Sequence, residues 1–271
     1  HRPPVPGATK KVSTSYRAPD DTAALERKRL QHLGALFDEP TISRLRRFGC
    51  QPGWHCLEIG AGSGSVARAL AALVAPDGHV LATDVDDRFL EGDEHQLEFR
   101  VHDITRDPLP ADQFDLAHAR GVLEHLRERA HALAAMVAAT KPGGFVVVED
   151  PDWVVFDTQR LPKAFGELHR TLREAYVAAA GYEPNLGGRL PSMLSEAGLV
   201  DVDAEGSVFT MRGATPSMEW YVLGLERSLP SLVEAGIVDG DLAAAGLEEV
   251  RDPRCSLLSP LQMTAWGRKP R

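Results

Sequence analysis

The sequence predicts an α/β protein with a mostly parallel sheet, and two observations carry this prediction. An apolar strand at 56–59 ends in a glycine-rich turn, and the apolar residues of 65–74 then recur at helical spacing. The alternation continues, with further strands predicted at 79–85, 97–104, 114–119 and 145–149 and a helix between the last two. Strands that alternate with helices form βαβ units, whose strands run parallel.

Helices are also predicted on both sides of this alternating region. The helical pattern is found at 20–37, 41–48, 191–197 and, with Gly and Pro interruptions, 216–250. Two more strands are predicted at 200–211 and 262–267. The alternation stops after Asp150, where residues 151–189 have a mixed helical and irregular pattern.

The length of the chain limits the number of domains it can form. With about 150 residues per domain, 271 residues correspond to one large domain or to one domain with an insertion. We expect 20–271 to form a single domain, in which three segments cap the sheet: 20–48, 151–189 and 213–258. The polar, Pro-rich residues 1–19 are expected to form a mobile arm. Because these first residues include neither an initiator Met nor an apolar signal segment, we interpret them as a truncated start.

Composition excludes several classes of partner. The chain carries 30 Lys and Arg against 39 Asp and Glu, a net charge of −9, and an acidic surface disfavours nucleic acid and anionic membranes. No apolar run approaches the roughly 18 residues of a membrane-spanning helix. The three cysteines have the spacing of neither a disulfide framework nor a zinc site. We therefore expect a cytoplasmic protein without a metal, a membrane contact or a nucleic-acid partner.

The glycine-rich turn is the main functional signal. Gly60, Gly62 and Gly64 stand between a strand and a helix, where glycine lets a ligand lie against the backbone. The dinucleotide fingerprint G-x-G-x-x-G/A has Gly or Ala at its sixth position, which here is Ser65. An NAD-dependent oxidoreductase is therefore a remote alternative, and no Tyr-x-x-x-Lys motif supports it.

Acidic residues follow the next two strands. Asp84 closes the second strand, where a carboxylate can accept hydrogen bonds from ribose hydroxyls. Asp103 and Ile104 close the third, where an acid could accept from an adenine amino group. Ligands of open α/β sheets bind at this carboxyl edge, so the pattern predicts an adenosine site.

Together these signals resemble the class I S-adenosylmethionine-dependent methyltransferases over residues 54–150. Within that class, the runs Leu57–Gly64 and Val122–Leu126 are similar to small-molecule methyltransferases related to those of ubiquinone and menaquinone biosynthesis. The resemblance implies a Rossmann-like, seven-stranded, mostly parallel sheet whose last strand is antiparallel, with helices on both faces and a helical cap. It also implies S-adenosylmethionine as cofactor and S-adenosylhomocysteine as product.

The resemblance further implies a set of cofactor-binding residues. They would border the methionine part, hold the ribose and adenine, or pair with the carboxylate of the cofactor. They are Glu58, Gly60, Ala61, Gly62, Asp84, Val85, Asp103, Ile104, Arg120 and Arg29.

Methyl transfer needs alignment of the attacking atom with the methyl group and the sulfur, and proximity alone can contribute about 7–11 kcal/mol. If the attacking atom is a hydroxyl oxygen, a base adds about 10²–10⁴-fold, whereas an amine or an activated carbon needs none. We predict His125 and Glu124 as the catalytic residues. The other candidate bases are His118, Asp150 and Asp152.

Aromatic residues in the arm and the cap segments predict an apolar substrate pocket. The substrate-binding candidates are Tyr16, Trp153, Trp220 and Tyr221. The predicted function is transfer of a methyl group to an oxygen, carbon or nitrogen of a small, partly apolar molecule, by a protein that could form a homodimer. The alternative is a protein of the same fold that binds the cofactor without transferring methyl, such as a cyclase or a regulator.

Overall fold

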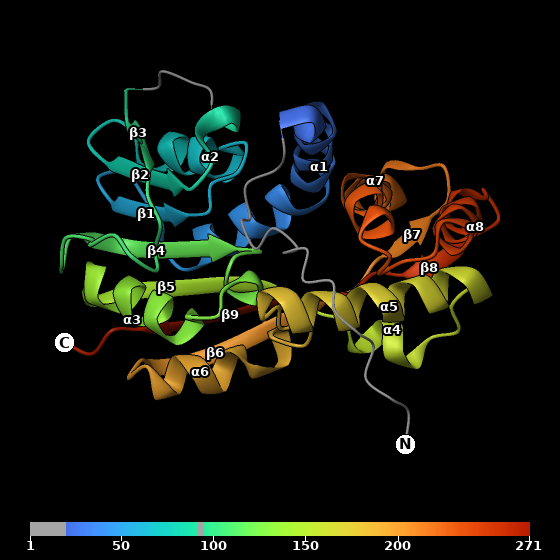
Figure 1. Cartoon of the computed structure of the whole chain (residues 1–271). Helices are drawn as coiled ribbons and strands as arrows, with labels where there is room; N and C mark the ends of the chain where they lie inside the picture. Colours follow the sequence, from blue (N-terminus) through green and yellow to red (C-terminus); the bar gives the residue numbers. More distant parts are fainter. Residues whose placement is uncertain (1–19, 91–94) are drawn as a thin grey trace.

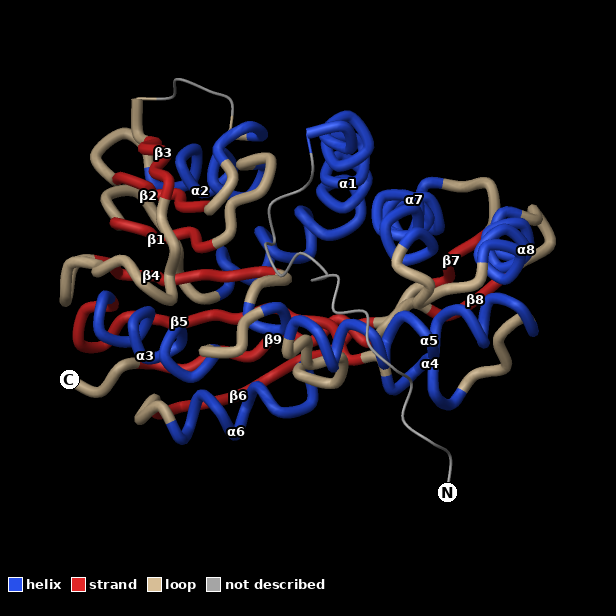
Figure 2. The backbone as a smooth tube through the Cα atoms, viewed as in Figure 1, coloured by secondary structure: helices blue, strands red, loops and turns tan. Residues whose placement is uncertain are grey.

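A seven-stranded sheet forms the centre of the computed structural model, which describes residues 20–90 and 95–271 (Figures 1 and 2). The strand order is β3-β2-β1-β4-β5-β9-β6. β1 to β5 pair in parallel, whereas β9 runs antiparallel to both of its neighbours. The bounds are β1 (His55–Ile59), β2 (His79–Asp84), β3 (Leu97–Val101), β4 (Phe114–Arg120), β5 (Thr140–Asp152), β6 (Val200–Ser207) and β9 (Leu261–Arg268). The predicted sheet is confirmed.

Helices cover both faces of this sheet, as predicted, because successive strand residues point to opposite sides. Leu57 and Ile59 of β1 pack in the cluster that includes α3 (Arg129–Ala139) and α6 (Leu190–Glu196). Cys56 faces the other way, towards α2 (Ser65–Val74). Each face therefore has its own apolar layer.

α1 (Ala23–Arg47) is one helix, so the two helices predicted at 20–37 and 41–48 are wrong. Pro40 lies inside it, and a proline in a helix interior normally breaks or kinks the helix. Beyond the proline, Ile42 and Leu45 are buried in the cluster with α2. This burial offsets the cost of the proline and holds the helix together.

The predicted strand at 200–211 is also wrong in extent. β6 ends at Ser207, and β7 (Thr210–Arg212) pairs instead with β8 (Ser256–Leu258) in a separate two-stranded sheet. Between β6 and β7, the backbone of Phe209 exchanges hydrogen bonds with Ser259. The chain therefore leaves the large sheet here and enters the cap region.

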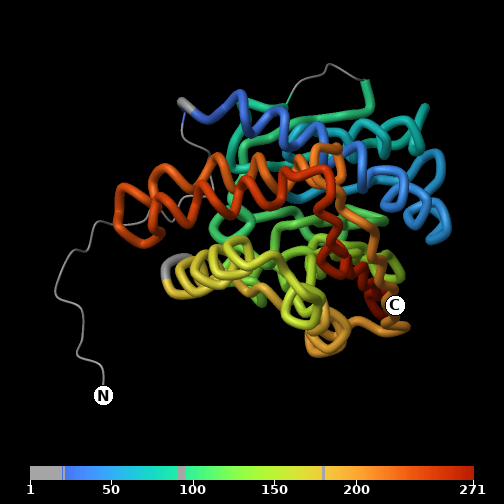
Figure 3. The backbone as a smooth tube through the Cα atoms, turned by 90° about the vertical axis from the view of Figure 1, so that its right-hand side faces the viewer, coloured from blue at the N-terminus to red at the C-terminus, as the bar shows by residue number. Residues whose placement is uncertain are grey.

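The cap consists of helices that stand beyond the carboxyl ends of the parallel strands (Figure 1). α1 runs beside α7, and α5 beside α8 (Figure 3). Buried aromatic side chains form a cluster between them, separate from the two layers on the sheet. The bounds are α4 (Val154–Thr158), α5 (Lys163–Ala180), α7 (Pro216–Glu234) and α8 (Gly240–Arg251). The grouping of cap and sheet in one domain stays a prediction, and the arm at 1–19 lies outside the described residues.

Short 3₁₀ helices complete the described chain. They are η1 (Asp20–Thr22), η2 (Asp87–Phe89), η3 (Leu123–His125) and η4 (Gly187–Arg189). Within the described ranges, the longer helices are too short or too polar to cross a bilayer.

Candidate functional site

The loop between β1 and α2 has a backbone that requires glycine. Gly60, Gly62 and Gly64 all have positive φ, at 68°, 55° and 74°. A Cβ atom on Gly60 would come within 2.4 Å of Cγ2 of Val122. A Cβ on Gly62 would lie 3.3 Å from Leu30 of α1. The loop is therefore held closely between the start of η3 and the first helix.

A cavity of about 750 Å³ opens beside this loop, within the size range of pockets for small molecules. It brings together every residue predicted to bind the cofactor, which are Glu58, Gly60, Ala61, Gly62, Asp84, Val85, Asp103, Ile104, Arg120 and Arg29. The predicted catalytic pair His125 and Glu124 and the predicted substrate residues Trp153 and Trp220 line it as well.

Two predicted substrate residues are not among those lining the cavity. Tyr16 lies outside the described residues. Tyr221 packs inside the aromatic cluster of the cap, where its hydroxyl lies 3.0 Å from Nδ1 of His169. The helical periodicity that turns Trp220 towards the cavity turns the next residue away from it.

A carboxylate and apolar side chains form the β2–β3 end of the cavity. The two oxygens of Asp84 accept hydrogen bonds from the backbone N–H groups of Gly62, at 2.8 Å, and Asp86, at 2.9 Å. Burial raises the pKa of Asp84. Val85 exposes 40% of its surface at this cavity, which suits the face of a flat ring. These features fit an adenosine group.

Asp103 stands at the same end. Its Oδ1 accepts hydrogen bonds from the backbone N–H and the hydroxyl of Thr105, at 2.9 and 2.6 Å. Burial acts to raise the pKa of Asp103, but these hydrogen bonds outweigh it and lower the pKa. The carboxylate is therefore an ionised acceptor at the mouth of the cavity.

Charged groups form the end of the cavity near β1 and β4. Oε2 of Glu58 lies 2.6 Å from Nδ1 of His118. The guanidinium of Arg120 donates to Asp38, at 2.7 Å, and to Thr41, at 3.0 Å, both on α1. This end thus offers carboxylate groups and a guanidinium group, the two kinds of partner that a zwitterionic amino-acid group requires. The sequence pattern does not predict these two α1 partners, because nothing in it shows what the polar residues of α1 face.

Arg29 lies on the cap side of the cavity. Its guanidinium donates to both carboxylate oxygens of Glu26, at 2.9 and 2.6 Å, and Arg227 of α7 donates to the same carboxylate at 2.8 Å. Burial acts to raise the pKa of Glu26, but the two guanidinium groups outweigh it and lower the pKa. The group ties α1 to α7 beside the cavity.

Two buried carboxyl groups lie next to each other here: Glu124, which lines the cavity, and Asp150, which does not. Oδ1 of Asp150 accepts from the backbone N–H of Glu124 at 3.4 Å. Oε2 of Glu124 and Oδ2 of Asp150 have no hydrogen-bond partner among the described residues. Burial, and for Glu124 the charge of Asp150, raises the pKa of both groups. A pair of this kind retains a proton more strongly than an ordinary carboxylate does.

The other candidate bases have different surroundings. His125 stacks on Tyr182 at 5.3 Å, and burial together with the charges of Arg29 and Arg227 lowers its pKa to about 3. Asp152 accepts backbone N–H groups of Val154 and Gly188, at 3.0 and 2.8 Å, which fixes the chain after β5. Among the described side chains, no group of three or more His, Cys, Asp or Glu is arranged to hold a metal ion.

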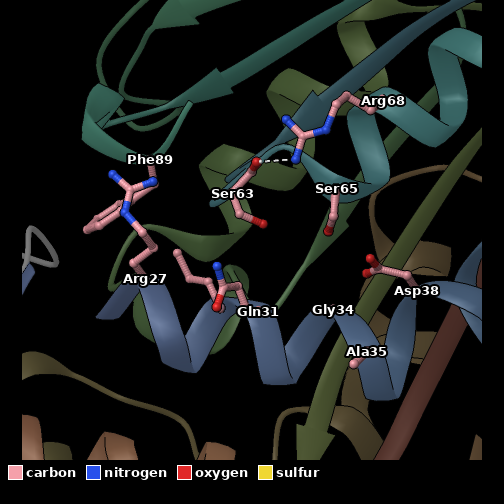
Figure 4. A pocket seen from close by; sticks show the side chains of 10 residues that line it. Arg27, Gln31, Gly34, Ala35, Asp38, Ser63, Ser65, Arg68 and Phe89 are labelled. Atoms are coloured by element: carbon pink, nitrogen blue, oxygen red, sulfur yellow. Dashed lines mark hydrogen bonds between the residues drawn. The ribbon is translucent and has the colours of Figure 1, made fainter. Parts of the chain in front are cut away.

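A second hollow of about 480 Å³ lies between α1, the glycine loop and α2 (Figure 4). Gln31 and Asp38 of α1 face Ser63 and Ser65 across it, and Arg68 donates to the backbone carbonyl of Ser63 at 2.7 Å. Both serines also line the larger cavity. The two hollows therefore share part of their lining, on α1 and on the glycine loop.

Comparison with known proteins agrees with this geometry. Residues 57–146 match a family model described as a methyltransferase domain. The chain is 27% identical to an uncharacterized 37.1 kDa protein in transposon TN4556 of Streptomyces fradiae, over 69% of this chain and 54% of that protein. It is 32% identical to the ubiquinone/menaquinone biosynthesis C-methyltransferase UbiE of Bordetella parapertussis, over 38% of this chain and 42% of that protein. The chain thus spans about half the length of these relatives.

The fold is similar to that of a solved methyltransferase. Phosphoethanolamine N-methyltransferase 2 of Haemonchus contortus, in complex with phosphomonomethylethanolamine and S-adenosylhomocysteine, aligns with a TM-score of 0.54 and 18% identity. The alignment covers 86% of this chain and 53% of that one.

Residues 57–146 are thus similar to a methyltransferase domain, and the chain shares its fold with a methyltransferase solved with S-adenosylhomocysteine. The cofactor that such methyltransferases use is S-adenosylmethionine. The cavity fits that cofactor on its own evidence, since it combines a glycine loop without room for a Cβ, a buried acid at Asp84 and opposite charges at Glu58 and Arg120.

Proposed function

We propose that this protein transfers a methyl group from S-adenosylmethionine to a small, partly apolar molecule whose attacking atom must lose a proton. The observation that carries the proposal is the buried carboxyl group of Glu124, which lines the cavity, beside that of Asp150. The cofactor supplies the electrophilic methyl group. A phenolic hydroxyl is the simplest acceptor of the class we propose.

The carboxyl pair supports a role for Glu124 as general base. Two carboxyl groups in a site of low polarity do not both ionise readily, so the pair titrates with a raised apparent pKa. A base is most effective when its pKa is near the working pH. His125, with a pKa of about 3, accepts a proton poorly. We therefore assign proton removal to Glu124 and give His125 no proton-transfer role.

The apolar part of the cavity supports a small organic acceptor. Phe37, Trp153 and Trp220 line it beside Glu124, and Phe37 contacts Trp220 edge to face at 6.0 Å. Such walls bind apolar surface and exclude water from the reacting atoms. Trp153 and Trp220 are thus proposed to hold the acceptor, with Glu124 at its acidic hydrogen.

The names of the relatives do not identify the methyl acceptor of this chain, because they refer to different acceptor atoms. The Bordetella protein is named a C-methyltransferase and the Haemonchus protein an N-methyltransferase. We therefore infer the class of acceptor from the side chains that line this cavity. The expected homodimer, the cytoplasmic location and the lack of a nucleic-acid partner stay predictions.

The test is transfer of a radioactive methyl group from S-adenosylmethionine to a panel of phenols, catechols and hydroquinones, with primary amines for comparison. We expect labelled phenolic products from the wild type. Glu124→Gln should lower kcat by about 10²–10⁴-fold and leave the Kd for S-adenosylhomocysteine within twofold. Glu128→Gln is the matched control, because Glu128 also lines the cavity but is exposed, and its kcat should be unchanged.

The pH dependence sharpens this test. The base works only when it is unprotonated, so the wild-type rate should fall about tenfold per pH unit below the raised apparent pKa of the pair. In Glu124→Gln the break at the pKa of the pair should be lost, and the residual rate should follow the ionisation of the acceptor hydroxyl itself. Full activity in that variant would refute the assignment. Tight S-adenosylhomocysteine binding with no labelled product would favour a protein that binds the cofactor without transferring methyl.

A further inference from the structure

His118 is a buried histidine that does not line the cavity but contacts Glu58, which does. It sits in the middle of β4, directly opposite Glu58 of β1 in the sheet register. Its side chain is fully buried, and Nδ1 lies 2.6 Å from Oε2 of Glu58. Glu58 lines the cavity and His118 does not. Any effect of His118 on a ligand must therefore pass through Glu58.

A second carboxylate faces the other nitrogen of the ring. Nε2 of His118 lies 4.0 Å from Oε2 of Glu149 on β5. Glu149 in turn accepts hydrogen bonds from the hydroxyls of Thr41, at 2.5 Å, and Thr264, at 3.0 Å. Polar groups of β1, β4, β5, β9 and α1 thus form one continuous layer under the β1–β4 end of the cavity.

The charges around His118 favour the imidazolium form. Burial acts to lower the pKa of the ring, but Glu58 and Glu149 outweigh it and raise the pKa. Arg120 on the same strand acts in the opposite direction. Arg44 of α1 lies near the same layer, 3.5 Å from Glu149. A buried carboxylate is costly unless it is paired and hydrogen-bonded, and His118 meets that need for Glu58.

We propose that His118 is a positioning residue for the methionine end of the cofactor. Its ring holds one oxygen of the Glu58 carboxylate in place, so that the other is held ready to accept a hydrogen bond from the cofactor ammonium group. This inference rests on the placement of the methionine part at Glu58, and it does not depend on which acceptor is methylated.

Two substitutions of His118 by neutral amide side chains, asparagine and glutamine, distinguish a positioning role from a general effect on stability. The amide nitrogen of an asparagine takes the place of Nδ1 and can still donate to Glu58, whereas that of a glutamine takes the place of Nε2 and cannot. Binding is measured by calorimetry with S-adenosylhomocysteine and with 5′-methylthioadenosine, which lacks the amino-acid part. We expect His118→Gln to raise the S-adenosylhomocysteine Kd about tenfold or more, and His118→Asn to stay within about threefold of the wild type.

The second ligand reports whether the effect is local. The Kd for 5′-methylthioadenosine should stay within twofold in both variants, because the adenosine residues are untouched. Equal loss of both ligands in His118→Gln would overturn the inference, as would an unchanged Kd for S-adenosylhomocysteine. Leu116→Ala is the stability control, because Leu116 is buried on the same strand and the same sheet face. It should lower Tm and leave the ratio of the two Kd values unchanged.

A double-mutant cycle decides the case if His118→Gln does not fold. Glu58→Gln should weaken S-adenosylhomocysteine binding selectively, and His118→Ala should do the same on its own. Adding His118→Ala to Glu58→Gln should have no further effect, since the two residues act as one unit. Additive losses would overturn the inference. A wild type that binds no S-adenosylhomocysteine would overturn the cofactor site itself. A wild type that binds it but transfers no methyl would refute only the proposed function.

Discussion

The cofactor half of the cavity and its cap half are built in different ways. In the cofactor half, each binding element is a short run of neighbouring residues at the end of a strand, and the backbone makes much of the surface. In the cap half, single side chains from distant segments meet. Glu26 and Arg227, for example, are 201 positions apart and share a hydrogen bond of 2.8 Å.

This difference explains how one fold can serve many acceptors. The glycine loop and the acids after β2 and β3 depend on strand ends that the whole sheet holds in place. The cap residues depend on how helices α1 and α7 pack, which can change without disturbing the sheet. A change in the cofactor half should therefore affect cofactor binding, and a change in the cap half should affect the acceptor and stability.

The largest expected effect is in the glycine loop. Gly60→Ala places a Cβ within 2.4 Å of Val122 at a φ of +68°, a conformation that costs an L-residue about 1–3 kcal/mol before the clash is counted. We expect the Kd for S-adenosylhomocysteine to rise about a hundredfold, as measured by calorimetry.

Gly53→Ala is the matched control. Gly53 has a φ of +87°, but a Cβ there meets no described heavy atom within 4 Å, so backbone strain is tested without a clash at the cavity. Its S-adenosylhomocysteine Kd should stay within twofold. If both variants lost binding alike, general destabilisation would be the cause and the contrast between the two halves would fail.

The next effect distinguishes two neighbouring acids. Asp84→Asn should raise the S-adenosylhomocysteine Kd about tenfold or more, the expected loss for a hydrogen bond to a charged group. Asp86→Asn should change it less than threefold, because Arg88 already donates to both oxygens of Asp86, at 2.8 and 2.5 Å. The reverse order would move the ribose site two residues along the chain.

The smallest expected effect is in the cap. Trp220→Phe should raise the KM for a methyl acceptor several-fold and leave the S-adenosylhomocysteine Kd within twofold. Because Trp220 also belongs to the cap cluster, Tm should fall, by roughly 2–4 °C for each kcal/mol lost. Trp266 of β9 packs instead in the cluster between the sheet and α2. Trp266→Phe should therefore lower Tm and leave KM unchanged. Equal losses of cofactor and acceptor affinity in Trp220→Phe would show that the halves are not separate.

The agreement between sequence and structure follows the same division. The helix predicted at 65–74 is α2 to the residue, because an amphipathic repeat directly after a glycine turn leaves little choice. The same pattern reasoning split α1 at Pro40 and extended the strand at 200 too far. In both cases packing against another segment decided the outcome, through Ile42 and Leu45 in α1 and through Ser259 beside Phe209.

The sequence by itself determined the alternation of the central strands with helices, the glycine turn after the first strand and the set of strand-end residues that line the cavity. These depend on local rules, namely strand alternation, glycine at positive φ and acids at strand ends. Only the tertiary structure decided that His118 faces Glu58, that Glu124 lies beside Asp150, and that Tyr221 turns away from Trp220's side of α7. Burial and the charges across a contact set the proton affinity and the role of such groups. Neither can be derived from the order of the residues alone.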